Sequence, residues 1–239
     1  MNTKAIMLGN EAIARGAWEA GAKLSSAYPG TPSTEISEYL AKYPEVYTEW
    51  APNEKVALEV AAGGAIAGTR TIACMKHVGL NVASDPLYTL AYTGVNGGLV
   101  IIVADDPGIA SSQNEQDTRM IARSAHLPVI EPSDSMEAKE FMKAAFEISE
   151  KYDTPVIFRT TTKLSHSQSI VEICDRTEIE DKVYERSVPK YVMMPASAIG
   201  RHKVVEAREN KLAEDASEFS INKLEYNDKK IGFITSGVA

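Results

Sequence analysis

The chain has 239 residues, of which 44% are hydrophobic, so it can bury one substantial core without disulfides or metal ions. Its net charge is −8 and its basic residues are scattered, which argues against a nucleic-acid partner. No apolar run reaches the roughly 18 residues of a membrane helix, and no basic-then-apolar leader is present. The two cysteines, Cys74 and Cys174, lack metal-binding spacing. We therefore expect a cytoplasmic globular protein with no membrane segment and no metal site of its own.

Strand and helix patterns alternate from about residue 5 to residue 159. Strands are predicted over residues 23–27, 46–50, 71–75, 99–104, 129–130 and 155–159. Helices are predicted over residues 10–21, 33–43, 52–68, 79–91, 117–125 and 135–152. We expect Asn10 to cap the first helix and Pro52 to take the first position of the third. The alternation predicts an α/β fold, a doubly wound, mostly parallel six-stranded sheet with helices on both faces and ligands at the carboxyl ends of its strands.

The composition changes after about residue 160. We divide the chain into a domain at residues 1–165, a linker at 166–229 and the start of another α/β domain at 230–239. The linker begins as an irregular polar connection and contains a charged helix predicted over 195–215. Residues 230–237 have the pattern of a buried strand followed by a glycine turn, so the chain looks like the N-terminal part of a longer protein.

Glu54 is the first candidate for chemistry, because it lies at the mouth of the helix predicted over residues 52–68. On spacing alone, a glutamate in the first turn is a solvated group that favours the helix dipole. The helix is rich in alanine and glycine, however, and each interior glycine costs about 1 kcal/mol relative to alanine. Another segment should therefore pack closely on it, the plain candidate being a helix, which would shelter the carboxyl group and let it share a proton with a ring nitrogen. Both interpretations stay open at this point.

Three further segments follow predicted strands at the same edge. The turn YPGTPS at residues 28–33 is either a loop that binds a polar ligand or a simple proline-bracketed helix start. His77 follows the strand at 71–75; a single histidine is more often a hydrogen-bonded structural residue, but it could also relay a proton. The polar loop at residues 105–116 is either a ligand-binding loop or a solvated surface loop.

Five segments taken together resemble the alpha subunits of indolepyruvate ferredoxin oxidoreductases. In chain order they read YPGTPSTEI, EWAPNEKVALEVAAGGAIAG, MKHVGLNVASDPL, VIIVADDPGIASSQNEQDTR and PVIFRTTTKLSHS. The resemblance covers residues 1–166, and residues 231–237 match the start of that family's next domain. It implies that residues 1 to about 160 adopt the pyrimidine type of the thiamine diphosphate-binding fold.

The resemblance also implies roles for individual residues. Glu54 falls on the glutamate that hydrogen-bonds N1′ of the cofactor's aminopyrimidine ring, and His77 would lie near the thiazolium ring. Thr31 lies in the turn that contacts the substrate carboxylate in related enzymes, whereas the 105–116 loop lacks the arginine that clamps this group in pyruvate-oxidising relatives. That departure agrees with a bulky aromatic 2-oxo acid. The remaining expected contacts are Tyr28, Pro29, Gly30, Gly79 and Asn81 to the cofactor, and Gln113 and Asn114, with Thr31, to the substrate.

The reaction that the resemblance implies is oxidative decarboxylation of an aryl 2-oxo acid to an acyl-coenzyme A. Electrons would pass through [4Fe-4S] clusters to ferredoxin, and partners would include a beta subunit and further domains of the same protein in a dimer or larger assembly. The GDG-to-Asn motif that holds Mg2+ and the diphosphate is missing here, as are the cysteine clusters, so we expect this chain alone to be inactive and to bind thiamine diphosphate weakly. Two alternatives remain: the pyrimidine-binding half of a decarboxylase or transketolase-like enzyme, and a noncatalytic α/β binding module. The lack of a GxGxxG motif or P-loop argues against a nucleotide-binding module.

Overall fold

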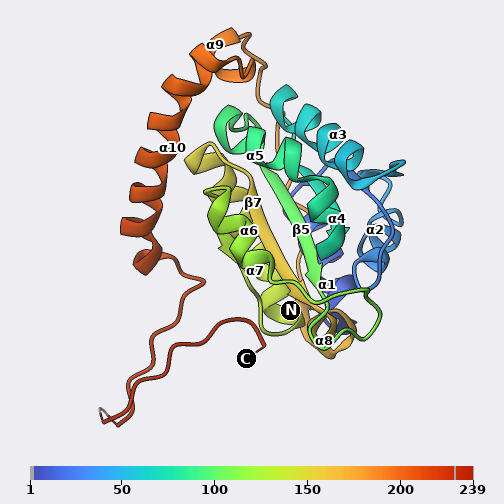
Figure 1. The fold of residues 1–239 in the computed structure, drawn as a ribbon. Helices are drawn as coiled ribbons and strands as arrows, with labels where there is room; N and C mark the ends of the chain where they lie inside the picture. The colour runs from blue at the N-terminus through green and yellow to red at the C-terminus, as the bar shows by residue number, and fades with distance from the viewer. Residues whose placement is uncertain (1–2, 229, 239) are drawn as a thin grey trace.

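A six-stranded parallel sheet forms the centre of the molecule, with the strand order β3-β2-β4-β5-β7-β6. Figure 1 shows two of its strands, β5 and β7, between the helices. The structure is a computed structural model that describes residues 3–228 and 230–238. The expected fold class and its six strands are confirmed. The strands are β2 (Leu24–Ala27), β3 (Tyr47–Trp50), β4 (Thr71–Lys76), β5 (Leu99–Asp105), β6 (Val129–Ile130) and β7 (Val156–Thr161).

Helices cover both faces of this sheet and give each face its own core. Successive residues of β5 point to opposite faces, so Val100 and Ile102 join one core while Ile101 and Val103 join the other. The first core includes α1 (Gly9–Glu19), α2 (Thr34–Leu40) and α7 (Ser135–Tyr152). The second includes α3 (Glu54–Ala67), α4 (His77–Val82), α5 (Ser84–Thr93) and α6 (Thr118–Ser124). No helix among the described residues combines the length and the apolar character needed to cross a membrane.

Three details of the predicted helices are wrong. Asn10 does not cap α1 but lies buried within it, where its Nδ2 donates to the carbonyl oxygen of Pro32 at 2.8 Å and so ties α1 to the start of α2. The cap of α3 is Asn53, whose Oδ1 accepts from the backbone N–H of Val56 at 3.0 Å, so the helix begins at Glu54 and not at Pro52.

The helix predicted over residues 79–91 is divided at Ala83 into α4 and α5. Pro86 explains the division, because it has no N–H to donate to the carbonyl one turn earlier.

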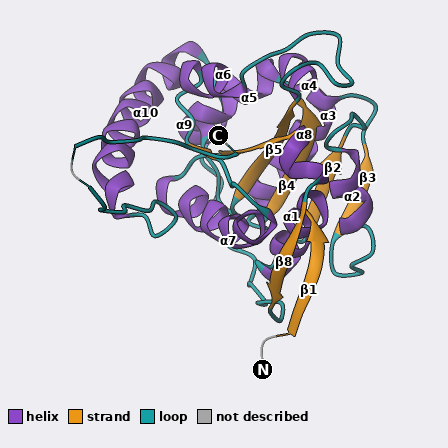
Figure 2. Ribbon diagram, turned by 90° about the horizontal axis from the view of Figure 1, so that it is seen from below, coloured by secondary structure: helices purple, strands orange, loops and turns teal. Residues whose placement is uncertain are grey.

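A separate antiparallel ribbon pairs β1 (Thr3–Leu8) with β8 (Gln168–Ile173), which follows α8 (Thr162–His166) (Figure 2). Within the ribbon, Val171 of β8 is fully buried, whereas the cross-strand pair Ile6 and Ile170 is largely exposed. The irregular connection expected after residue 160 is therefore wrong for residues 168–173. Nothing local indicates this strand, because its partner lies more than 160 positions earlier in the chain.

The expected charged helix is present as α10 (Pro195–Asp215), between α9 (Val188–Tyr191) and the short 3-10 helix η1 (Ala216–Glu218). It lies along one side of the molecule (orange in Figure 1) and is docked on the body, not free as a linker helix would be. Val205 is fully buried, and the guanidinium of Arg208 donates to the carbonyl oxygens of Ala91 at 2.7 Å and Asp153 at 3.0 Å. Arg208 thus joins α10 to the carboxyl ends of α5 and α7.

The buried strand expected at residues 230–237 is wrong for this structure. The described part of this segment has no strand, and Ile231, Phe233 and Ile234 are exposed. The segment contacts the body near its end, where Ser236 Oγ donates to Glu131 Oε2 at 2.7 Å. That these residues open another α/β domain stays a prediction.

Candidate functional site

Four of the segments that follow strands converge at one edge of the sheet. Because β2, β3, β4 and β5 are parallel, the 28–33 turn, the start of α3, the start of α4 and the 106–117 loop all lie at the carboxyl edge. Ligands bind at this edge in open α/β sheets. The sequence-predicted candidates therefore share one edge of the sheet.

Glu54 and Gly79 are candidate residues that pack against each other. A Cβ added to Gly79 would lie 2.5 Å from Oε1 and 2.6 Å from Cγ of Glu54, so the glycine leaves the space that the glutamate side chain fills. Glu54 is half-buried, and its carboxylate has no hydrogen bond or ion pair with any residue that the structure describes. The start of α3 thus presents a sheltered carboxylate with unused acceptor oxygens.

The glycines of α3 have a different explanation from the helix packing expected. A Cβ at Gly64 would lie 2.7 Å from Cγ2 of Thr71, so this glycine admits the underlying sheet. Gly63 has no atom within 4 Å of its hypothetical Cβ and is exposed on the described surface. Packing against a second helix is therefore the wrong explanation for Gly64, and nothing in the structure explains Gly63.

His77 contacts the loop after β5. Its ring is fully buried, and Nε2 lies 3.0 Å from the carbonyl oxygen of Asn114. Because a carbonyl can only accept, Nε2 carries the hydrogen and a neutral ring has an unprotonated Nδ1. That Nδ1 is buried and has no partner in the described part of the chain. His77 thus anchors the loop through the backbone carbonyl oxygen of Asn114. As whole residues, Gln113 and Asn114 are exposed.

Asp106 is the first residue of the same loop, and its carboxylate anchors the loop through hydrogen bonds. Its Oδ2 accepts from the backbone N–H of Ser111 at 2.8 Å and from Oγ of Ser112 at 2.6 Å, while Oδ1 accepts from Oγ1 of Thr162 at 2.7 Å. Burial opposes the charged form, but these hydrogen bonds outweigh it and hold the pKa of Asp106 well below its ordinary value. The loop is therefore a surface loop with exposed tips and buried anchors.

Asp105 secures the far end of the loop. It is fully buried, and it accepts from Oγ1 of Thr118 at 2.5 Å and from Nε of Arg159 at 2.6 Å. Arg159 in turn pairs with Glu131 at the end of β6. This network holds the start of α6 against the ends of β5 and β7, so both ends of the loop have fixed positions.

The 28–33 turn is held by hydrogen bonds between its backbone and the hydroxyl groups of Ser33 and Thr34, and it lies against β4. The N–H of Gly30 donates to Oγ1 of Thr34 at 2.9 Å, and Oγ of Ser33 donates to the carbonyl of Gly30 at 2.8 Å. A Cβ at Gly30 would lie 3.1 Å from Cβ of Lys76, so the turn passes close over this lysine. The turn's exposed residues are Tyr28, Pro29 and Thr31.

Asn81, which was expected to contact the cofactor, has no described side-chain interaction with the other candidate residues. Its side chain is exposed on α4. The anchors that sequence reasoning missed are Lys76, Asp105, Asp106 and Thr162. Their signal in the sequence was a charged or hydroxyl residue directly at the end of a buried strand.

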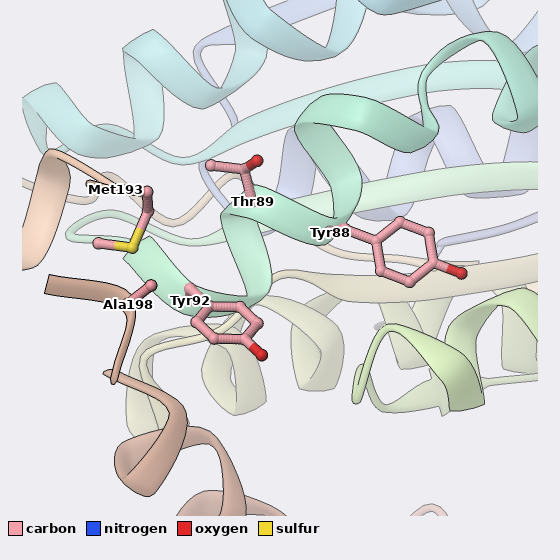
Figure 3. Close-up of a pocket in the computed structure, with 5 residues that line it drawn as sticks. All are labelled: Tyr88, Thr89, Tyr92, Met193 and Ala198. Atoms are coloured by element: carbon pink, nitrogen blue, oxygen red, sulfur yellow. The ribbon is translucent and has the colours of Figure 1, made fainter. Parts of the chain in front are cut away.

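Two cavities lie away from this edge. One, of about 220 Å3, is formed between α5 and the segment leading into α10 and is lined by Tyr88, Thr89, Tyr92, Met193 and Ala198 (Figure 3). The other, of about 380 Å3, is a groove between α6 and α10. Neither cavity is lined by a residue that the sequence placed in the site.

The fold and the family pattern now define the class of this protein. The chain belongs to the family described as the thiamine diphosphate-binding domain of pyruvate flavodoxin/ferredoxin oxidoreductases, which matches residues 15–230. The resemblance seen in the sequence is therefore confirmed.

More specific relatives are subunits of indolepyruvate oxidoreductases. The chain is 47% identical to indolepyruvate oxidoreductase subunit IorA of Methanothermobacter thermautotrophicus and 43% identical to that of Archaeoglobus fulgidus, with 99% of this chain and 39% of each relative covered. It thus spans about two fifths of the length of these relatives. A 2-oxoglutarate:ferredoxin oxidoreductase from Magnetococcus marinus shares the fold, with a TM-score of 0.74 and 18% identity over 89% of this chain and 46% of that one.

Proposed function

We propose that the chain is the pyrimidine-binding part of the alpha subunit of an aryl 2-oxo acid ferredoxin oxidoreductase that acts on indolepyruvate. The observation that carries the proposal is the carboxylate of Glu54, which lies against Gly79 at the carboxyl edge and has no partner among the described residues. The indolepyruvate oxidoreductase subunits that match nearly the whole chain support the choice of substrate.

The residues at this edge fit the aminopyrimidine of thiamine diphosphate. When bound, this cofactor supplies the reactive carbon and the electron sink for decarboxylation of 2-oxo acids. Glu54 would hold N1′ through a hydrogen bond between its carboxyl group and the ring nitrogen, because its oxygens have no competing donor among the described residues. Gly79 has no side chain and therefore leaves room for the carboxyl group of Glu54 at this position. The 28–33 turn would border the ligand.

The remaining components belong to the same proposal. They are Mg2+, [4Fe-4S] clusters, coenzyme A, a beta subunit, ferredoxin and a dimeric or larger assembly in the cytoplasm. The names of the relatives support a protein of several subunits. Weak cofactor binding by this chain alone stays a prediction.

The test is Glu54→Gln in the assembled oxidoreductase. An amide cannot exchange a proton with N1′ as a carboxyl group does, so we expect turnover to fall by about 100- to 10,000-fold, the usual contribution of a positioned acid or base. The circular dichroism spectrum and the melting temperature should stay unchanged. Glu59→Gln is the matched control, because Glu59 lies on α3 with its side chain 51% exposed. Normal turnover by Glu54→Gln would contradict the proposal.

Product analysis separates the alternatives. An oxidoreductase releases acyl-coenzyme A and reduces ferredoxin, whereas a decarboxylase releases an aldehyde and reduces nothing. A noncatalytic module would give neither product with any 2-oxo acid.

A further inference from the structure

Lys76 is a buried cation that has no counter-ion among the residues that the structure describes. Only 8% of its surface is exposed, and its ammonium donates to one neutral acceptor, the carbonyl oxygen of Ser111, at 2.8 Å. An ammonium carries three N–H donors. No carboxylate of the described residues lies within ion-pair distance of it. Burial of an unpaired charge is costly, so a missing anion would complete this environment.

Two of the three other buried lysines and arginines pair with carboxylates. Arg70 pairs with Glu150 through two hydrogen bonds of 2.9 Å. Lys139 contacts the carboxylates of Glu19 at 3.0 Å and Glu140 at 2.7 Å. The fourth, Arg208, donates to two helix-terminal carbonyl groups. Lys76 thus differs from Arg70 and Lys139 in having no carboxylate partner among the described residues. Arg208 shares that lack and has a buried Nε without a described partner, but it lies between α10 and the ends of α5 and α7, away from the candidate site.

The position of Lys76 points this charge toward the candidate site. Its Cβ and Cδ lie 3.1 and 3.5 Å from the hypothetical Cβ of Gly30, and its Nζ reaches Ser111 in the loop after β5. The side chain therefore passes between the turn that contains Thr31 and the loop that contains Gln113. Those are the two segments in which the substrate contacts are expected.

We propose that the ammonium of Lys76 binds the carboxylate of the 2-oxo acid substrate. This inference rests on the proposed function and adds the group that recognises the substrate's negative charge. The 106–117 loop contains no arginine. The first arginine after it, Arg119, pairs with Asp117. Lys76 supplies the positive charge from β4 instead and leaves the loop free to contact the aromatic part of the substrate.

The test compares two inhibitors of the assembled oxidoreductase that differ only in charge. Indole-3-lactate has the carbon skeleton and carboxylate of indolepyruvate, and its carboxamide is neutral. In Lys76→Met we expect the inhibition constant of indole-3-lactate and the KM of indolepyruvate to rise by about 10- to 100-fold, the range for a charge-assisted hydrogen bond. Inhibition by the carboxamide should change less than threefold, and Lys76→Arg should restore most of the affinity for the acid.

Lys55→Met is the matched control, because Lys55 lies at the start of α3 and pairs with Asp85 in a largely exposed position. An equal loss of affinity for acid and amide, or no loss for either, would overturn the inference. So would weakened binding of thiamine diphosphate with unchanged KM, since the lysine would then serve the cofactor. If the wild-type complex oxidises no aryl 2-oxo acid, the proposed function fails and this inference fails with it. If oxidation is normal but independent of Lys76, only the inference fails.

Discussion

At the scale of single residues, Gly79 controls where the carboxyl group of Glu54 can lie. Gly79→Ala would place a methyl group 2.5 Å from Oε1, which forces the glutamate side chain to move. We expect turnover of the assembled enzyme to fall at least tenfold, because a displaced acid no longer meets the ring nitrogen. Steady-state kinetics checks this, and unchanged turnover would show that Glu54 has room to adjust.

Neighbouring glycines in α3 offer a matched pair of substitutions with opposite expected signs. Gly63→Ala adds a methyl group in open space and removes backbone freedom from the unfolded chain, so it should stabilise the chain by about 0.5–1 kcal/mol. Gly64→Ala places a methyl group 2.7 Å from Thr71 and should destabilise it by about 1–3 kcal/mol. Urea unfolding of this chain measures both, and equal effects would contradict the packing described.

Some residues of the candidate site could be named from the sequence and others could not, for a physical reason. Glu54 and Gly79 belong to motifs, so they could be identified from the sequence alone. The contact between Lys76 and Ser111 uses a backbone carbonyl, which every residue has, and therefore leaves no trace in residue type. His77 was placed near the cofactor, but its described hydrogen bond is with the carbonyl of Asn114.

At the scale of elements, the loop after β5 depends on the charge of Asp106. Its pKa is lower in the folded chain than its unfolded value of about 3.9, so the ionised group stabilises the loop above that pH. The contribution is lost only as the pH falls through the lower folded value. We expect hydrogen exchange in residues 107–117 to stay slow from pH 7 down to pH 4, after correction for intrinsic rates.

Asp106→Asn should accelerate that exchange at every pH in this range, because an amide has one acceptor oxygen where the carboxylate uses two. Asp134→Asn, which changes a helix cap on the exposed start of α7, is the control. Equal exchange in the loop of wild type and Asp106→Asn would show that other contacts hold it.

The docking of α10 rests on Arg208. Its burial lowers the pKa of the guanidinium to about 10, yet its hydrogen bonds satisfy carbonyl groups at the ends of α5 and α7. Arg208→Met would leave those carbonyl groups unpaired, at about 1.5–3 kcal/mol, and lower the melting temperature by about 3 to 12 °C. The exposed Arg123→Met is the control in the same thermal scan. Equal melting temperatures would mean that α10 is held by apolar contacts such as Val205.

At the scale of the whole molecule, the sequence predicted the sheet because each strand and helix has a local signature. The buried strand β5 is an unbroken apolar run, and α7 matches its predicted bounds, residues 135–152. The β1–β8 ribbon and the docking of α10 depend on partners far away in the chain. Such pairings are invisible to periodicity, which reports only which side of an element is buried.

The β1–β8 ribbon has a consequence for the order in which the protein is made. Residues 3–8 are synthesised before the six-stranded sheet, but their partner strand at 168–173 is synthesised only after it. At typical translation rates the first strand waits roughly 8 to 33 seconds on the ribosome with its edge unpaired. The ribbon therefore closes only after the strands of the sheet have been made, and a nascent chain must keep Ile6 and its neighbours from pairing with other chains during that interval.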